Sequence, residues 1–272
     1  MRYAVIGHVE WVDFARVPHL PRSGEIVDAE ETWAEVAGGG AVAAAVLVRL
    51  AGDATLFTAL GADELGDRCR GGLEALGVRV EAAPLDVAQR RAFTHVEPGG
   101  ERTITVLGER LGPAGAENLA WEDLRGAEAV YFVSGGAEAL RAVRMARHVV
   151  ATARALPTLI GAGVEVDVLL GSGSDEGERY SPGALDPPPR AVVRTAGADG
   201  GTWERADGST GSWPGAVVPG PVEDAYGAGD SFAAGLTFAL GAGEDLPAAC
   251  RFGADQGAEA LTRRGAHGAA GA

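Results

Sequence analysis

The chain has few cysteines, no long uncharged apolar run and fewer basic than acidic residues. Its two cysteines, Cys69 and Cys250, lie far apart and belong to no motif, which favours the reducing cytoplasm. No apolar stretch approaches the ~20 residues that span a bilayer. The apolar start, residues 1–7, is too short for a signal peptide and predicts a first strand. We therefore expect a cytoplasmic protein without a membrane partner.

The charge balance argues against a second class of partner. The chain has 23 Lys and Arg against 38 Asp and Glu, a formal net charge of −15. A nucleic-acid-binding protein needs a basic face that neutralises phosphates, so we expect no nucleic-acid partner. An anionic nucleotide stays compatible with this charge, because local amides and Mg²⁺ can hold its phosphates. The five histidines have no metal-binding spacing, and only His8, beside Gly7, falls in the expected mouth of a cleft.

What the chain does have is a regular alternation of strand-like and helix-like segments. With 272 residues, 46% of them hydrophobic, it can form one large domain, which we expect to span 1–272. Strand-like runs occupy residues 3–7, 55–60, 78–81, 129–133, 148–151, 167–170 and 191–195, and helical patterns occupy residues 41–50, 64–76, 138–147 and 246–261. This order predicts an α/β fold with a mostly parallel sheet and helices on both faces.

Two segments interrupt this alternation. Residues 11–37 hold a Pro-rich stretch and then a β-like run at 25–36, and residues 91–106 alternate across a Pro-Gly-Gly turn, which predicts a hairpin. Neither segment needs a partner helix, so we expect the two to pair as a small sheet standing off the main one. Residues 203–213 predict another hairpin, and residues 265–272 predict a frayed tail.

The window Asp224–Asp230 carries the strongest functional signal. It reads Asp-Ala-Tyr-Gly-Ala-Gly-Asp and leads into an apolar stretch that recurs every four residues from Phe232, which predicts a buried helix. A helix N-terminus with unobstructed N–H groups favours an anion. A carboxylate in the same turn can take the proton of a hydroxyl that attacks a phosphoryl group. The alternative is an ordinary tight turn that Asp230 caps.

This window resembles the D-[TS]-x-G-A-G-D signature of the ribokinase, or PfkB-type, carbohydrate kinases. The resemblance implies that Asp230 is the catalytic base and that Gly227, Ala228 and Gly229 form the anion hole for the transferred phosphoryl group. It also implies a ribokinase-like three-layer sandwich, in which a small β lid built from about 11–37 and 91–106 closes over the substrate. The chain departs from the signature at Ala225, where the family usually has Thr or Ser.

A second segment with the family resemblance begins at Gly38-Gly39-Gly40-Ala41 and corresponds to G-G-x-A-x-N-x-A. The resemblance implies that Gly38 and Gly39 let the backbone approach the substrate. Ala43 stands where the family has an Asn that binds a substrate hydroxyl, so that contact is lost or supplied elsewhere. Asp13 resembles the early aspartate that grips two sugar hydroxyls in family members, and Glu10 is a nearby competitor for this role.

Two arginines, Arg91 and Arg102, fall on the predicted lid hairpin. Either they point at an anionic substrate or at the transferred phosphate, or they are solvated surface side chains. We take Arg102 as a candidate substrate-binding residue.

The nucleotide site is predicted by resemblance alone. Residues 194–201 resemble the family's T-x-G-x-x-G loop, which implies ATP contacts from Thr195, Gly197, Asp199 and Gly200. The family's N-x-x-E motif has its nearest match at Ser172–Asp175, followed by Glu176, so Asp175 is expected to hold Mg²⁺ through water. Asp224 corresponds to a monovalent-cation site, for which K⁺ is the expected ion.

Taken together, the motifs predict ATP-dependent phosphorylation of a hydroxymethyl group on a small polar acceptor, with a sugar as the first choice. A nucleoside or a vitamin alcohol such as pyridoxal remains an alternative acceptor, and a non-catalytic ligand-binding protein of the same fold remains an alternative class. The resemblance further implies a homodimer formed through the lid.

Overall fold

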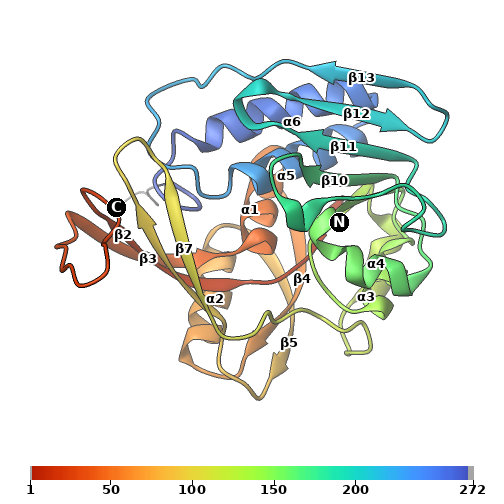
Figure 1. Cartoon of the computed structure of the whole chain (residues 1–272). Coiled ribbons are helices and arrows are strands. Elements are labelled where there is room, and N and C mark those ends of the chain that lie inside the picture. The colour runs from red at the N-terminus through yellow and green to blue at the C-terminus, as the bar shows by residue number, and fades with distance from the viewer. Residues whose placement is uncertain (1, 269–272) are drawn as a thin grey trace.

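The structure, a computed structural model, describes residues 2–268 and is built around a nine-stranded sheet (Figure 1). Its strand order is β13-β12-β11-β10-β9-β8-β1-β4-β5. The pairs from β11 to β5 are parallel, and β12 and β13 add an antiparallel hairpin at one edge. The strands are β1 (Tyr3–Ile6), β4 (Ala54–Gly61), β5 (Val78–Leu85), β8 (Ala129–Phe132), β9 (His148–Thr152), β10 (Val168–Ser172), β11 (Ala191–Thr195), β12 (Gly201–Arg205) and β13 (Thr210–Trp213).

Helices cover both faces of this sheet. They are α1 (Gly39–Ala51), α2 (Glu64–Ala75), α3 (Ala137–Val143), α4 (Leu156–Ala162), α5 (Ala228–Gly241) and α6 (Leu246–Ala260). Side chains of α1, α2, α5 and α6 share one core cluster, and those of α3 and α4 belong to a second. Because both faces are covered, β1 and β4 are buried at every residue, as expected for parallel strands. The predicted α/β architecture is confirmed.

A second, four-stranded sheet stands off the first, at the left of Figure 1. Its order is β3-β2-β6-β7, and its strands are β2 (Glu10–Arg16), β3 (Glu31–Ala37), β6 (Arg91–Val96) and β7 (Arg102–Leu107). The two segments that interrupt the sequence alternation are thus joined where β2 pairs in parallel with β6. β7 forms one edge and is exposed along its whole length.

Three elements differ from the sequence prediction. The β-like run at 25–36 becomes a strand only from Glu31, where β3 gains its partner β2. The helix predicted at 138–147 ends at Val143 and continues as turns. The helix α4 escapes prediction, because its seven residues, with Pro157 near the start, are too few to show a helical period.

Residues 265–268 are packed rather than frayed. Ala266 is buried, and its N–H donates to Glu35 Oε1 at 2.8 Å. The imidazole of His267 shares a 2.7 Å hydrogen bond with a carbonyl of β3. The prediction of a frayed tail is wrong here, because the partners lie on β3, more than 200 residues earlier. The rest of the predicted tail, residues 269–272, lies outside the described residues.

Both cysteines are free and buried. Within residues 2–268, the helices are all too short or too polar to cross a membrane.

Candidate active site

The turn before α5 brings the predicted catalytic residues together. Gly227 has φ 73°, a left-handed conformation that glycine adopts without strain, and a Cβ there would lie 2.9 Å from Val42 Cγ1. The helix begins at Ala228, so Asp230 lies in its first turn. A Cβ added to Gly229 would meet nothing within 4 Å. The side of Gly229 on which a side chain would lie is therefore open, and a helix N-terminus of this kind can bind a phosphoryl group.

Asp230 has the electrostatic setting of a general base. Burial raises its pKa to about 6, against the opposing charges of Arg102 and Arg154. The carboxyl groups of Glu178 and Glu10 act in the same direction as burial. At neutral pH the Asp230 carboxylate is therefore ionised, yet it is more basic than an ordinary aspartate, which suits it to accept a proton.

The start of α1 approaches Asp230 as closely as glycine allows. A Cβ added to Gly39 would lie 2.8 Å from Asp230 Oδ1 and 3.1 Å from Val133 Cγ1. Gly38 has φ 90°, and its N–H donates to the Tyr226 hydroxyl at 3.3 Å. Gly39 thus lies beside Asp230, and Gly38 is the residue before it in the chain. These are the two glycines that the sequence predicts to contact the substrate.

The two acidic residues of β2, Glu10 and Asp13, lie on different faces of the strand. A Cβ added to Gly38 would lie 3.2 Å from Glu10 Cγ, and the charge of Glu10 raises the pKa of Asp230. Asp13 is three residues further along the strand, where side-chain alternation turns it to the other face. Its carboxylate pairs there with Arg91 Nη2 at 2.9 Å. Glu10, and not Asp13, is the acid of β2 that the structure brings to Asp230.

Arg102 extends from β7 toward the same centre. Its guanidinium carbon lies 6.0 Å from the centre of the Tyr226 ring. Among the neighbouring charges, that of Arg102 has the largest effect on the pKa of Asp230. The structure therefore brings the Arg102 charge to the base.

The predicted nucleotide loop is held against the helix that carries the base. It follows Thr195 at the end of β11 and includes the exposed turn Gly197–Asp199. Gly200 has φ 85°, and a Cβ there would lie 2.1 Å from the Trp213 carbonyl oxygen. The Trp213 ring stacks on Phe232 of α5 at a centroid distance of 5.7 Å. The loop and Asp230 therefore belong to one packed unit.

The end of β10 presents two acids to one arginine. Arg154 Nη2 donates to Asp175 Oδ2, and Arg154 Nε lies 2.5 Å from Glu178 Oε1. Glu178 is the more buried of the two acids, with 12% of its side chain exposed against 36% for Asp175. Its charge also raises the pKa of Asp230. Glu178 is therefore a second candidate for the acid that acts through magnesium.

Asp224 joins the signature turn to the C-terminal segment. It is fully buried, Oδ1 accepts from Tyr226 N at 2.6 Å and Oδ2 accepts from Gly265 N at 2.5 Å. Both oxygens thus have N–H donors already. Among the described residues, no three His, Cys, Asp or Glu side chains gather as metal ligands. The role of Asp224 in binding K⁺ stays a prediction.

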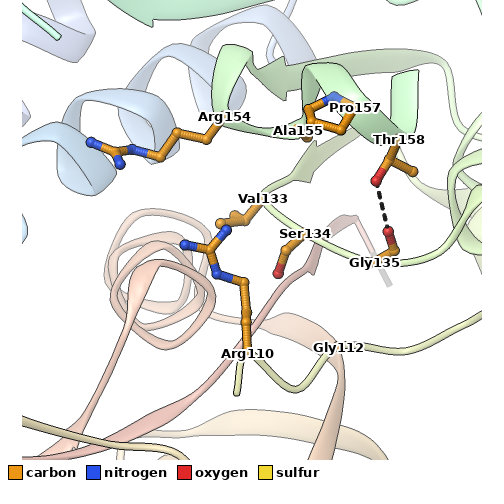
Figure 2. A pocket seen from close by; sticks show the side chains of 9 residues that line it. All are labelled: Arg110, Gly112, Val133, Ser134, Gly135, Arg154, Ala155, Pro157 and Thr158. Carbon is orange, nitrogen blue, oxygen red and sulfur yellow. Dashed lines mark hydrogen bonds between the residues drawn. The ribbon is translucent and has the colours of Figure 1, made fainter. Parts of the chain in front are cut away.

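A cavity of about 310 Å³ opens between the ends of β8 and β9 (Figure 2). Its walls are formed by Arg110, by residues of the segment 133–135 and by residues of the segment 154–158. Arg110 follows β7 in the chain. Val133 lies near both the cavity and Asp230, because a Cβ on Gly39 would be 3.1 Å from Val133 Cγ1 and 2.8 Å from Asp230 Oδ1. On the wall, Ser134 Oγ lies 3.1 Å from His8 Nδ1. Burial, with nearby arginines, lowers the pKa of His8 to about 3, so this imidazole is neutral at physiological pH.

Comparison with known proteins identifies the family. The model of the pfkB family carbohydrate kinases matches residues 2–156 and 173–270, which is nearly the whole chain. The chain belongs to this family. The resemblance of the Asp224–Asp230 window is thereby confirmed, and the chain is a carbohydrate kinase of the PfkB type.

Individual relatives of this PfkB kinase agree with the family assignment. A curated ATP-dependent ribose-1-phosphate kinase from Halopiger xanaduensis is 27% identical, over 99% of this chain and 95% of its own length. The solved ribokinase of Thermotoga maritima has a TM-score of 0.78 at 21% identity, covering 98% of this chain and 95% of that one. The adenosine kinase of Sinorhizobium meliloti also has a TM-score of 0.78, at 19% identity, covering 98% and 96%. At such low identities, the likeness to these solved structures shows that this chain has the same fold and shows nothing about its substrate.

Sequence reasoning missed several polar residues of this PfkB kinase. Glu178 had a signal, because Asp175-Glu176-Gly177-Glu178 keeps the N-x-x-E spacing with Asp in the first position. Arg154 and Ser134 each follow a strand of the parallel sheet, where α/β proteins place their ligand contacts. Arg110 follows β7 and matches no motif.

Proposed function

We propose that this kinase transfers the γ-phosphoryl group of ATP to the hydroxymethyl group of a sugar, with Asp230 as the general base. The observation that carries the proposal is the position of Asp230, whose pKa is about 6, in the first turn of α5, directly after Gly227–Gly229. A hydroxyl bound at this carboxylate faces a phosphoryl group bound at the amides. Such an arrangement suits in-line transfer.

Each group near the base has its own part in the transfer. Asp230 takes the hydroxyl proton while the oxygen attacks phosphorus. The amides of Gly227–Gly229 and the guanidinium of Arg102 stabilise the negative charge on the phosphoryl oxygens. Glu10, which pairs with Arg90 Nε at 2.6 Å, accepts hydrogen bonds from acceptor hydroxyls in place of Asp13.

Magnesium fits the acids at the end of β10. Carboxylate oxygens are the ligands that Mg²⁺ prefers, and Asp175 and Glu178 meet at Arg154. We assign these two acids to the ion that accompanies ATP, held through water. The ion supplies neutralisation of the nucleotide phosphates, and Arg154 keeps the two carboxylates together.

The choice of a sugar is supported by the relative from Halopiger xanaduensis, which is named for ribose 1-phosphate. A nucleoside is the second candidate. The adenosine kinase fold matches this chain as closely as the Thermotoga ribokinase fold, and Ala43 replaces the family's sugar-contacting Asn. The Ala43 side chain is fully buried in the main core, so it offers no polar contact to a sugar hydroxyl.

An acceptor panel in a coupled ADP-release assay tests this function. The panel comprises ribose, ribose 1-phosphate, fructose, adenosine and pyridoxal, each measured with and without Mg²⁺. We expect Mg²⁺-dependent ADP release with at least one of the sugars. Turnover with adenosine or pyridoxal alone would contradict the sugar assignment. No turnover with any acceptor would favour a non-catalytic, ligand-binding protein.

The four-stranded sheet is proposed to act as a lid and to pair two copies of the chain. β7 is an edge strand, and its Ile104, Val106 and Leu107 side chains are exposed. An open strand edge with apolar side chains favours pairing with a second copy. Light scattering should give the mass of a dimer, and a Val106→Lys variant should shift it toward the monomer. A monomeric wild-type protein would contradict the pairing.

A further inference from the structure

The turn between β6 and β7, residues 97–101, contacts the segment that leads into α5. Ala225 N–H donates to the Gly100 carbonyl oxygen at 2.9 Å. A Cβ added to Gly100 would lie 3.2 Å from Asp224 Cα and 2.8 Å from Val222 Cγ1. In Figure 1, the tip of this yellow hairpin reaches the blue chain before α5. The two backbones therefore approach so closely that a side chain at position 100 has no room.

Internal hydrogen bonds give this turn a defined shape. Gly100 N donates to the Glu97 carbonyl at 3.0 Å, and Glu97 N donates to the Glu101 carbonyl at 2.9 Å. Gly99 and Gly100 have φ 97° and 87°, values that favour glycine. Their surroundings differ, because a Cβ on Gly99 would meet nothing within 4 Å. Of the two glycines, Gly100 is thus the one that packs against the segment before α5.

The contact is made at Ala225, the residue at which the chain departs from the family signature. Its methyl group forms no hydrogen bond, whereas its N–H binds the turn. The next residue, Tyr226, packs edge-on against Phe14 of β2 at a centroid distance of 5.1 Å. The four-stranded sheet therefore contacts two consecutive residues of the signature, directly before Gly227.

The same turn precedes Arg102, the first residue of β7, two positions after Gly100. Arg102 is exposed, and within residues 2–268 no ion pair holds its guanidinium. Its position near the Tyr226 ring therefore depends on the backbone that carries it. The other charged groups that act on the pKa of Asp230 lie outside this hairpin: Glu10, Arg154 and Glu178.

We propose that Gly100 is a positioning residue for phosphoryl transfer, because its contact with Ala225 holds Arg102 and the turn Gly227–Asp230 in one arrangement. The inference rests on the proposed function, in which Asp230 takes the proton and Arg102 stabilises the phosphoryl oxygens. Gly100 has no side chain to offer to a substrate, so it acts through these other groups. Charged groups that are already in place stabilise a transition state without reorganisation, which makes their placement important for kcat.

Gly100→Ala and Gly99→Ala form a matched pair of variants. Both place an alanine at a positive φ and share that strain, but only Gly100→Ala also clashes with the segment 222–225. We expect Gly100→Ala to lower kcat by about tenfold, since a displacement of about 1 Å can cost 10²-fold. Gly99→Ala should keep kcat within about twofold of the wild-type value.

The pKa of Asp230 tests whether the turn acts through Arg102. The Arg102 charge lowers this pKa, so a turn that moves away removes that effect. Carbon-13 NMR titration of the carboxyl should give a pKa about 0.5–1 higher in Gly100→Ala than in the wild type, part of the 1–3 that a neighbouring opposite charge supplies. Arg102→Gln should give at least the same rise, and Gly100→Ala should add little to it in the double variant. This titration needs no turnover.

Hydrogen exchange of the wild-type protein tests the contact without any substitution, so it does not depend on the folding of a variant. The Ala225 amide should exchange at least about tenfold more slowly than the exposed Gly99 amide. Equal exchange at the two amides, equal kcat in the two variants, or an unchanged Asp230 pKa in Gly100→Ala would each overturn the inference. A protected Ala225 amide and a raised Asp230 pKa in a protein that transfers no phosphoryl group would leave the contact standing and contradict the proposed function.

Discussion

Gly39 and Asp230 come from helices nearly 190 residues apart, yet no side chain fits between them. The position of a Cβ on Gly39 lies 2.8 Å from Asp230 Oδ1, closer than carbon and oxygen atoms approach without a bond. The N-terminal turns of α1 and α5 therefore meet at the Asp230 carboxylate. The turn at Gly39 therefore limits where the Asp230 carboxylate can lie, and the carboxylate excludes a side chain at position 39.

Gly39→Ala should lower kcat more than it lowers stability. The added methyl group forces Asp230 away from its position, and Val133 on the other side leaves it little room. A displacement of the base by a fraction of an ångström should cost roughly tenfold in kcat, since about 1 Å can cost 10²-fold. Steady-state kinetics with thermal denaturation measures both effects. Gly71→Ala is the matched control, because a Cβ there meets nothing within 4 Å. Equal kcat values for the two variants would contradict the close approach.

The pH dependence of kcat/KM should show an acid limb near pH 6. Asp230 must be ionised to take a proton, and burial raises its pKa to about 6. Activity should therefore be complete above about pH 7 and fall about tenfold per unit well below pH 6. An acid limb near pH 4, the value for an exposed aspartate, would show that burial does not act on the catalytic group.

Asp224→Ala should destabilise the fold. The substitution removes the acceptor of two buried N–H groups, on Tyr226 and Gly265. Because hydrogen bonds to a charged group contribute about 1.5–3 kcal/mol each, we expect the free energy of unfolding to fall by about 3 kcal/mol. Urea denaturation measures the loss, with the exposed Asp53→Ala as control. A change below about 0.5 kcal/mol would mean that Asp224 does not hold the two segments together.

The turn before α5 could be predicted from the sequence because it is local. Seven consecutive residues, Asp224–Asp230, contain the proposed base, the proposed anion-binding amides and the glycine that has a left-handed conformation. The parallel sheet was predictable for a similar reason, since each strand is a short apolar run. No long-range information enters either inference.

The proposed substrate side of the cleft depends on long-range geometry, which the sequence does not show. The choice between Asp13 and Glu10 is set by which face of β2 turns inward, and a shift of one residue reverses that face. Arg154 and Glu178 meet only because β9 and β10 are neighbours in the sheet. The packed tail at 265–268 likewise depends on acceptors from β3.

Asp230→Asn tests the general-base mechanism most directly. The amide keeps the shape of the side chain but cannot take a proton, so kcat should fall by about 10²–10⁴. Affinity for ATP, measured by calorimetry, should stay within about twofold, because the amides of Gly227–Gly229 are unchanged. The acid limb near pH 6 should also disappear from any residual activity. A kcat near that of the wild-type enzyme would contradict the assignment of Asp230 as the base.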